Sequence, residues 1–214
     1  MSSTRVLVAD ANSTDDTREV VLSFRDRLNV SVIPGGMPAV GRNRGAAIAD
    51  TPYVLFLDAD VQLAETYLLR RCMARMRRKR HHLITTNILC REGNWIDQLF
   101  YRGNDFFQYL SCLHRPFATG MFMLFDRLKF LELGGFDERI RFAEDYCLSQ
   151  QIDRRRFAIV RGGVYTTNRR FQKMGHLRVG WLFLWTAMNF WNERHFLRDH
   201  KYWGEEADSV EEPV

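Results

Sequence analysis

Short apolar runs alternate along this chain with segments of helical periodicity, and this alternation restricts its fold more than any other feature. Apolar runs at Arg5 to Ala9 and Tyr53 to Leu57 are typical of buried strands, and Val20 to Leu28 shows helical spacing between them. Further strands are expected at 30–33, 83–86 and 122–125, and helices at 46–50, 64–80, 95–110 and 144–153. The alternation predicts an α/β, Rossmann-like fold with a mostly parallel sheet and helices on both faces.

Length and composition favour one soluble globular domain. The chain has 214 residues, of which 46% are apolar and 27% charged, which excludes disordered, fibrous and disulfide-stapled classes. We expect a main domain over residues 1–175, then an aromatic helix and an acidic tail over 176–214. The four cysteines form no CxxC pair, so we expect free thiols in a reducing compartment. The start of the chain carries no signal-peptide pattern, which favours the cytoplasm.

Charge is unevenly distributed along the chain. Seven Lys or Arg and no acid lie between Arg70 and Arg80, whereas six acids and one Lys lie from Asp199 to the end. The basic run is a candidate for binding phosphates or an anionic membrane. We favour a helix with a charged outer face, because apolar residues recur between the arginines at helical spacing. These residues are Leu69, Cys72, Met73 and Met76.

Acidic residues directly follow two of the expected strands. Asp10 follows the first run, and Asp58-Ala59-Asp60 follows Tyr53 to Leu57. Ligands in such folds bind beyond the carboxyl ends of the strands, so we expect these acids to face one crevice. Two carboxylates repel each other unless a cation or donors lie between them, and a Mg²⁺ or Mn²⁺ ion bridged to a diphosphate fits that need. The alternative is a pair of acids that cap the next helix.

Four ordered segments add a resemblance. They are Asp-Ala-Asn-Ser-Thr-Asp from Asp10, Arg-Asn-Arg-Gly from Arg42, Asp-Ala-Asp from Asp58, and Gly-Gly-Phe-Asp-Glu from Gly134 followed by Glu-Asp-Tyr-Cys-Leu. In order and spacing the chain resembles a family 2 glycosyltransferase of the GT-A fold over about residues 6–152. The resemblance implies transfer of a sugar from a nucleotide-diphospho-sugar donor to an acceptor hydroxyl, with inversion and with a divalent metal, Mn²⁺ or Mg²⁺.

The resemblance also implies roles for the donor-side residues. Asp60 would bind the metal, and Asp58 would orient the ribose or share the metal. Asp10 would contact the nucleoside with Ser13 near it, and Arg42 would pair with a carboxylate or phosphate. The structural alternatives are that Asp10 or Ser13 caps the following helix, and that Arg42 pairs with Asp58.

Inversion by single displacement needs a carboxylate that takes the acceptor proton, and Asp145 is the candidate. Glu144 would point toward the acceptor or a backbone donor, and Gly120 would form the acceptor-side floor. The alternatives are an acidic first helical turn for the two acids and a simple turn for Gly120.

A basic segment farther along the chain resembles the one that follows the last strand in many relatives. Arg169 and Arg170 would hold the leaving diphosphate. His176 would be a further metal ligand, with a surface or core histidine as the alternative. The Gln-x-x-Arg-Trp pattern of processive synthases is absent, which favours a single-addition, non-processive transferase.

The aromatic segment from Val179 to Trp191 would lie on a membrane surface, or pack over the sheet or at a dimer contact. Expected partners are therefore a glycan or lipid-linked acceptor in cell-surface glycan biosynthesis, with a peripheral contact on the cytoplasmic membrane face and no nucleic acid.

The chain departs from the family pattern at its start. The family begins one strand earlier, and this chain starts at what resembles the second strand, so we expect unpaired backbone groups where the first strand would lie. Ala11 also stands where an acid is common. One alternative function is a non-catalytic transferase-like domain that binds nucleotide or a partner. A nucleotidyltransferase is another, against which the Glu144-Asp145 pair argues.

Overall fold

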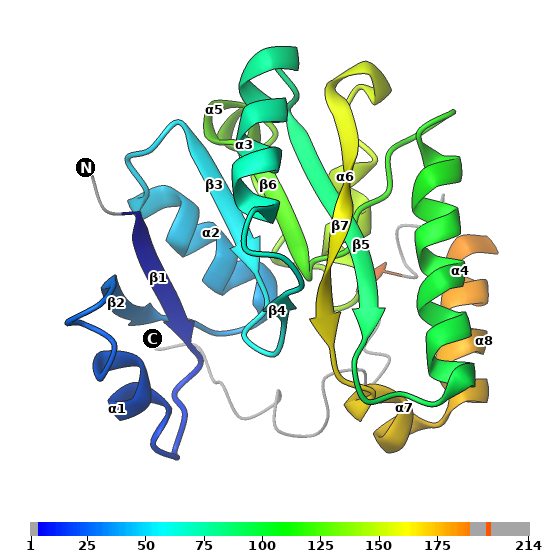
Figure 1. Cartoon of the computed structure of the whole chain (residues 1–214), viewed down its shortest axis with the longest axis horizontal. Coiled ribbons are helices and arrows are strands. Elements are labelled where there is room, and N and C mark those ends of the chain that lie inside the picture. Colours follow the sequence, from blue (N-terminus) through cyan, green and yellow to red (C-terminus); the bar gives the residue numbers. More distant parts are fainter. Residues whose placement is uncertain (1–3, 189–195, 198–214) are drawn as a thin grey trace. The chain divides into compact units, whose positions relative to one another are not determined.

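A computed structural model describes residues 4–188, 196 and 197 of the chain. These residues form two compact units, each with its own sheet. The first unit comprises residues 4–51, 135–144, 196 and 197, and the second comprises residues 52–134 and 145–188 (Figure 1). The predicted α/β class is confirmed in both.

The first unit is built on two parallel strands. β1 (Arg5–Asp10) pairs in register with β2 (Asn29–Pro34), and α1 (Thr17–Leu22) connects them. α1 starts earlier than predicted and stops at Leu22, because the following residues form turns. α2 (Pro38–Ile48) begins with proline, whose fixed φ and missing N–H suit the first helical turn.

Gly35 allows the loop after β2 to return close to β1. A Cβ atom at this position would lie 2.7 Å from the carbonyl carbon of Asp10, which is nearer than real Cβ atoms approach backbone. The Gly35 N–H donates a hydrogen bond to the Asp10 carbonyl oxygen over 2.7 Å. The glycine therefore sets the position of the Asp10 backbone at the end of its strand.

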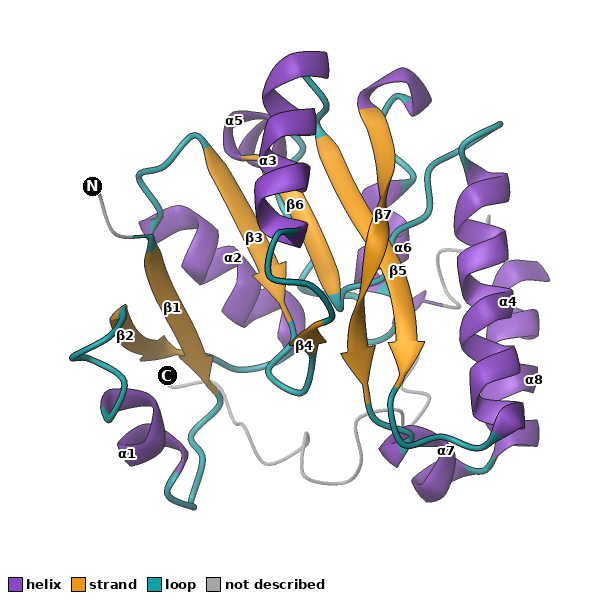
Figure 2. Ribbon diagram, viewed as in Figure 1, coloured by secondary structure: helices purple, strands orange, loops and turns teal. Residues whose placement is uncertain are grey.

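The second unit contains a five-stranded sheet with the order β3-β6-β5-β7-β4 (Figure 2). Its strands are β3 (Tyr53–Leu57), β4 (Gln62–Leu63), β5 (Leu83–Cys90), β6 (Phe122–Asp126) and β7 (Phe157–Thr166). The predicted mostly parallel arrangement is wrong for this sheet, because only β5 and β7 pair in parallel. An apolar run predicts which residues are extended but not the direction in which the strand runs. The chain reverses between β5 and β6, so these two strands are antiparallel.

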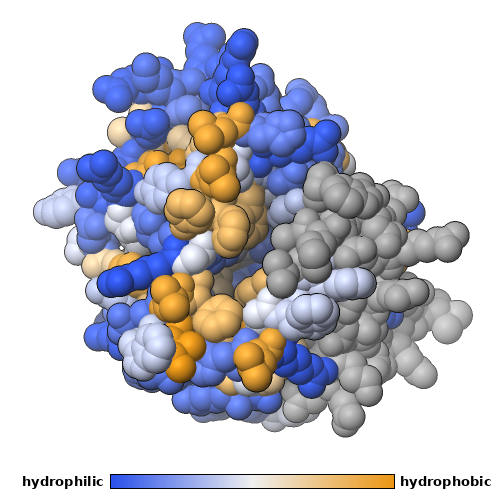
Figure 3. Space-filling model, turned by 90° about the vertical axis from the view of Figure 1, so that its right-hand side faces the viewer, coloured by the Kyte–Doolittle hydropathy of each residue, from blue (hydrophilic) through white to orange (hydrophobic). Residues whose placement is uncertain are grey.

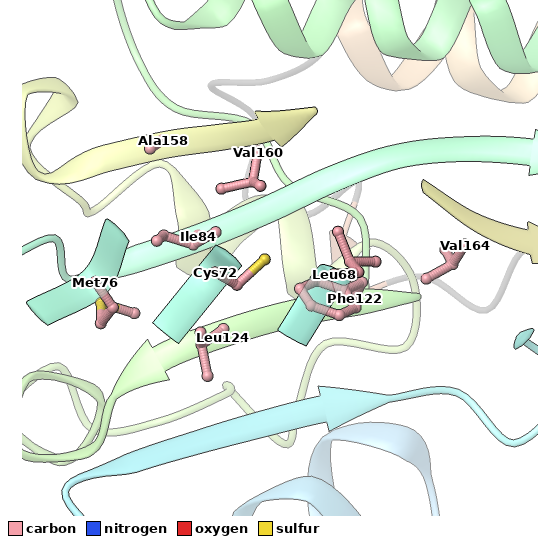
Figure 4. Close-up of a cluster of buried hydrophobic side chains, with 9 residues drawn as sticks. All are labelled: Leu68, Cys72, Met76, Ile84, Phe122, Leu124, Ala158, Val160 and Val164. Atoms are coloured by element: carbon pink, nitrogen blue, oxygen red, sulfur yellow. The ribbon is translucent and has the colours of Figure 1, made fainter. Parts of the chain in front are cut away.

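Helix α3 (Leu68–Lys79) covers one face of this sheet (Figure 4). Its buried residues Leu68, Cys72 and Met76 recur every fourth position and pack against side chains of β5, β6 and β7. The predicted amphipathic helix is confirmed, but Leu69 is 37% exposed and Leu68 takes its expected place in the buried stripe. The helix starts later than predicted, because residues 64–67 form a bend and a turn after β4.

Helix α5 (Arg127–Glu132) covers the opposite face. The ring of Phe130 lies 5.3 Å from that of Phe125 and 4.9 Å from that of Phe56. Successive β6 side chains point to opposite faces, so Phe125 meets α5 whereas Leu124 meets the α3 cluster. Helices on both faces of the sheet are therefore confirmed.

The remaining helices lie in or next to the second unit. They are α4 (Trp95–Ser111), α6 (Glu144–Ser149), the short 3₁₀ helix η1 (Arg154–Arg156), α7 (Arg169–Met174) and α8 (His176–Met188). The predicted domain boundary at 175/176 falls between α7 and α8 and stays a prediction. Phe190, Trp191 and the acidic tail lie outside the described residues.

Two further findings concern the cysteines and the length of the helices. All four cysteines are free, as predicted. Among the described helices, none has the length and apolar character needed to cross a bilayer.

Candidate active site

Asp10 ends β1 with a carboxylate that is only 1% exposed. One oxygen accepts hydrogen bonds from the Ser13 N–H over 3.1 Å and from the Ser13 hydroxyl over 2.5 Å, and the other pairs with Arg18 Nε over 2.5 Å. The Ser13 hydroxyl and the Arg18 guanidinium hold the pKa of Asp10 below its ordinary value. The N-cap residue of α1 is Asp16, so neither Asp10 nor Ser13 caps that helix as the alternative proposed.

Arg42 on α2 forms a buried ion pair with Glu144. Arg42 Nη1 lies 2.6 Å from Glu144 Oε1, and the two side chains are 14% and 5% exposed. The Arg42 guanidinium also lies over the Phe136 ring, 5.4 Å from its centroid. The Asn43 side chain exchanges hydrogen bonds with the backbone N–H and carbonyl of Phe136 at 2.9 and 2.8 Å. Two motifs of the sequence, Arg-Asn-Arg-Gly and Gly-Gly-Phe-Asp-Glu, are thus joined in the first unit.

Asp58 and Asp60 lie in the turn that follows β3 in the second unit. Asp60 Oδ2 lies 3.3 Å from Arg169 Nη2, and both side chains are well exposed, at 43% and 69%. Arg169 begins α7, shortly after β7 ends at Thr166. The predicted acidic pair and the predicted basic segment therefore meet at the edge of the sheet where β3 and β7 end.

Arg170 lies among acidic side chains from separate segments. Burial lowers the pKa of its guanidinium, and the nearby Tyr101, Asp58, Asp60 and Asp145 act in the opposite direction. A guanidinium keeps its charge in proteins, so Arg170 is a fixed positive centre within this carboxylate group. The arrangement brings five of the predicted residues together, since Asp60 also contacts Arg169.

Asp145 is held by backbone donors in the second residue of α6. Its Oδ2 accepts the Gly120 N–H over 2.5 Å, and its Oδ1 accepts the Tyr146 N–H over 2.7 Å. Gly120 is buried immediately before β6. The two predicted acceptor-side residues are therefore in direct contact, and the carboxylate is fixed in orientation.

Tyr101 is a member of this group that sequence reasoning missed. Its hydroxyl donates to the Thr167 carbonyl over 3.2 Å, and burial raises its pKa to about 12. Arg170 acts to lower that pKa, and Asp60 acts to raise it. Tyr101 is one of several aromatic residues in α4, and such residues usually pack in a core. Only its contacts in the folded chain distinguish it from the others.

His176 pairs with Asp97, another residue that the sequence did not single out. His176 Nε2 lies 2.5 Å from Asp97 Oδ1, and the Asp97 side chain is 1% exposed. Asp97 also accepts the Asn94 N–H at the start of α4 and the Asn168 side-chain amide. Burial raises the pKa of Asp97, but the bonds from His176, Asn168 and Asn94 outweigh it and leave that pKa lowered. Metal binding through His176 Nε2 would require this contact to open.

The acidic pair suits a divalent ion that shares its ligands with a substrate. Among residues 4–188, 196 and 197, no group of three or more His, Cys, Asp or Glu gathers as a complete metal cage. Mg²⁺ commonly uses only one or two protein carboxylates and takes its other oxygens from water and phosphate. Asp58 and Asp60 match that donor set, and the basic side chains beside them suit the remaining phosphate charge.

Comparisons with known proteins agree with this arrangement. The family model "Glycosyl transferase family 2" matches residues 2–134. Validoxylamine A glucosyltransferase of Streptomyces hygroscopicus subsp. jinggangensis is 40% identical over 67 residues, which is 29% of this chain and 16% of that protein. The same enzyme of subsp. limoneus is also 40% identical over 67 residues.

Solved structures share the fold at low identity. S. aureus TarS 1-349 in complex with UDP-GlcNAc has a TM-score of 0.58 at 19% identity, with 76% of this chain and 49% of that one covered. The mannosyltransferase PcManGT from Pyrobaculum calidifontis, in complex with GDP-Man and Mn²⁺, has a TM-score of 0.61 at 18% identity, with 83% and 50% covered. Glucosyl-3-phosphoglycerate synthase from Mycobacterium tuberculosis has a TM-score of 0.59 at 16% identity, with 94% and 71% covered.

The chain spans about half of the TarS and PcManGT chains and only 16% of the glucosyltransferase, so it matches a part of these proteins. The structural likeness shows the GT-A fold. With its ordered motifs and a family match that covers more than half of its length, the chain belongs to glycosyl transferase family 2.

Proposed function

We propose that this protein transfers a sugar from a nucleotide-diphospho-sugar to an acceptor hydroxyl, with inversion and with help from a divalent metal. The observation that carries the proposal is the group around Arg170. Carboxylates that follow β3 and a carboxylate of α6 lie near enough to one guanidinium to act on its pKa, and a second guanidinium contacts Asp60. This combination of charges suits a substrate that carries a diphosphate and reacts at a neighbouring carbon.

The donor diphosphate would lie between the acidic pair and the arginines of α7. Asp60, together with Asp58, would hold Mn²⁺ or Mg²⁺, which supplies Lewis-acid stabilisation of the diphosphate charge when it is bound. Arg169 and Arg170 would bind the phosphate oxygens through charge-assisted hydrogen bonds. In this account Arg169 exchanges its present contact with Asp60 for one with the diphosphate.

The nucleoside would be bound by the first unit. We assign Asp10 and Ser13 to it from their place at the end of β1, and Arg42 from its motif on α2. Ser13 and Arg18 fix the Asp10 carboxylate in its charged form, ready to accept further hydrogen bonds. Arg42 would act through its buried pair with Glu144, which holds the guanidinium in one orientation.

Asp145 would be the general base of the transfer step. It takes the proton of the acceptor hydroxyl, and that oxygen forms a bond to the anomeric carbon on the face opposite the leaving group. The bond from the anomeric carbon to the diphosphate breaks with its electron pair, and the nucleoside diphosphate leaves. The Gly120 and Tyr146 N–H groups orient the carboxylate for this role. One sugar would be added per acceptor.

An exposed apolar surface supports a lipid-linked acceptor and a peripheral membrane contact. Apolar side chains gather on the face that carries α4 and α8 (Figure 3). Trp95 and Phe107 of α4 are 73% and 61% exposed, and Trp181 of α8 is 62% exposed. Aromatic side chains favour the interface between water and lipid. We expect the wild-type chain to sediment with anionic vesicles and Phe107→Ser to reduce that binding, and equal binding of both would contradict the contact.

The proposed function is tested by ligand-dependent thermal stability. The melting midpoint is measured with UDP, GDP, dTDP and CMP, each with and without Mn²⁺, because a ligand that binds only the folded state raises it. A rise that needs both a nucleoside diphosphate and metal is expected for the wild type. Asp60→Ala should abolish the rise. Asp50→Ala, which removes an exposed carboxylate that precedes β3 in the chain, should retain it.

A cooperative melt that responds to no nucleotide would contradict the proposal and favour the non-catalytic alternative. A response that survives in Asp60→Ala would contradict the assignment of the acidic pair. A rise in the melting midpoint that needs nucleotide but no metal would support the nucleotide site and contradict the role of the metal.

A further inference from the structure

A polar pocket lies in the second unit, at the end of the sheet where β3, β5 and β7 begin. Its volume is about 270 Å³. His82 immediately precedes β5, and Arg156 immediately precedes β7. Asp58 and Arg169 follow the ends of β3 and β7, so the pocket lies at the opposite end of the sheet from the proposed diphosphate site.

A buried histidine without hydrogen-bond partners lines this pocket. His81 is 7% exposed, and within the described chain neither of its ring nitrogens has a hydrogen-bond partner. Burial lowers the pKa of His81. The Arg156 carbonyl acts in the opposite direction, but it already accepts the His82 N–H over 2.7 Å. The buried Nδ1 of His82 is also without a partner among the described residues. Unpaired buried polar groups are costly and rare, so their presence together indicates a missing ligand.

The charge on the pocket wall favours an anion. Arg77, Arg80 and Arg156 line it, whereas Asp126 is the one carboxylate among its lining residues, all of which are described. Arg156 Nη1 donates to the Arg80 carbonyl over 3.2 Å, which holds that guanidinium at the pocket. Asp126 already accepts the Lys129 N–H at the start of α5. Three guanidinium groups against one carboxylate exclude a cation as the ligand.

A purely structural explanation covers only part of this arrangement. Basic residues in the last turn of α3 offset the negative end of its dipole, and Arg77 fits that role. Arg156, however, comes from the 3₁₀ helix η1 before β7, and the dipole of α3 gives no reason for a buried His81 with two unpaired nitrogens. A ligand that accepts hydrogen bonds from several directions explains all three residues.

We propose that this pocket binds a phosphate group, carried either by a small soluble molecule or by a lipid headgroup. A phosphate offers several oxygens in a tetrahedral arrangement, which matches guanidinium and imidazole donors from α3, the turn before β5, and η1. A carboxylate has two oxygens in one plane and can form a bidentate pair with only one guanidinium. The volume lies just below the range of about 300 to 1,000 Å³ that is usual for drug-sized ligands, which favours a compact group.

The experiment uses inorganic phosphate as the probe, titrated at constant ionic strength against sodium chloride. Binding is measured by calorimetry and by the NMR signals of the histidine ring nitrogens, which report on His81 and His82 directly. The double variant Arg77→Gln/Arg156→Gln removes two pocket arginines. Its matched control, Arg78→Gln/Arg155→Gln, removes the same charge from neighbouring exposed positions that do not line the pocket.

We expect saturable phosphate binding that shifts the His81 and His82 signals, weakened about tenfold or more in Arg77→Gln/Arg156→Gln. The control double variant should bind phosphate as the wild type does. Vesicles of phosphatidylcholine with and without phosphatidic acid distinguish the source. Binding that needs phosphatidic acid and the same two arginines, without a response to free phosphate, would assign the site to a lipid headgroup. Absence of both responses, or equal losses in the two double variants, would overturn the proposal.

Discussion

Breaking the ion pair between Arg42 and Glu144 should destabilise the first unit strongly. The pair is short, at 2.6 Å, and nearly closed to water, with side chains 14% and 5% exposed. Arg42→Met leaves the Glu144 carboxylate buried opposite an uncharged group, for which a cost of about 3 to 5 kcal/mol is typical. That is a large fraction of the roughly 5 to 15 kcal/mol that stabilises a typical domain. The melting midpoint should fall by about 6 to 20 °C.

A double-mutant cycle separates the pair from its parts. Glu144→Leu alone should also destabilise the chain, because it removes the carboxylate that balances the Arg42 guanidinium. The double variant Arg42→Met/Glu144→Leu removes both charges and should be more stable than Arg42→Met, since well-packed apolar pairs often replace buried ion pairs without loss. Urea unfolding is followed by circular dichroism and tryptophan fluorescence, whose agreement tests for a single transition.

An unfolding midpoint of Arg42→Met at the same urea concentration as the wild type would contradict the stabilising role of the ion pair. That role would also be refuted if the losses of the two single variants simply added in the double variant. If the two compact units unfold separately, the change should appear in the transition of the first unit, since both side chains belong to it.

Three further outcomes are expected. Asp145→Asn should lower the transfer rate by about 10² to 10⁴ and leave nucleotide binding unchanged in calorimetry, and a near-normal rate would remove the general base from the account. Asp10→Asn should destabilise the chain at neutral pH, because the folded state holds the pKa of Asp10 below its ordinary value of 3.8. The charged carboxylate therefore adds its full share to the free energy of unfolding above that ordinary value, and this share is lost as the pH falls through the folded pKa. The difference between wild type and variant in urea unfolding should therefore shrink in acid, and a difference that grows would contradict this. Gly35→Ala should cost about 1 to 3 kcal/mol, because its Cβ would meet the Asp10 backbone at 2.7 Å, and an unchanged unfolding midpoint would show that the loop gives way.

Strands made of continuous apolar residues could be predicted from the sequence. The run Tyr53 to Leu57 forms β3 with the predicted bounds, and α4 starts at Trp95 as predicted. β7 was missed because Arg161-Gly162-Gly163 interrupts its apolar pattern. That strand depends on its pairing with β5, which contains a register shift at Thr86/Asn87. Long-range pairing of this kind, and the direction of β6, are not encoded in a local pattern.

Part of the candidate site could also be predicted. The argument from strand ends located Asp58 and Asp60, and the structure brings them to Arg170. Tyr101 and Asp97 could not be found in the same way, because their partners lie about seventy residues later in the chain, at Thr167 and His176. An aromatic or acidic residue in a helix has many ordinary roles, and only folding shows which one it takes.

The proposed transfer breaks the bond between the sugar and the diphosphate of a nucleotide sugar. Its most direct test is to incubate the chain with UDP-glucose, UDP-GlcNAc and GDP-mannose, with Mn²⁺ or Mg²⁺, and to separate the nucleotide products by anion-exchange chromatography. We expect release of the nucleoside diphosphate from at least one donor, lost in Asp60→Ala and retained in Asp50→Ala. Release of pyrophosphate instead, or no product from any donor by a folded chain, would contradict the proposed transfer.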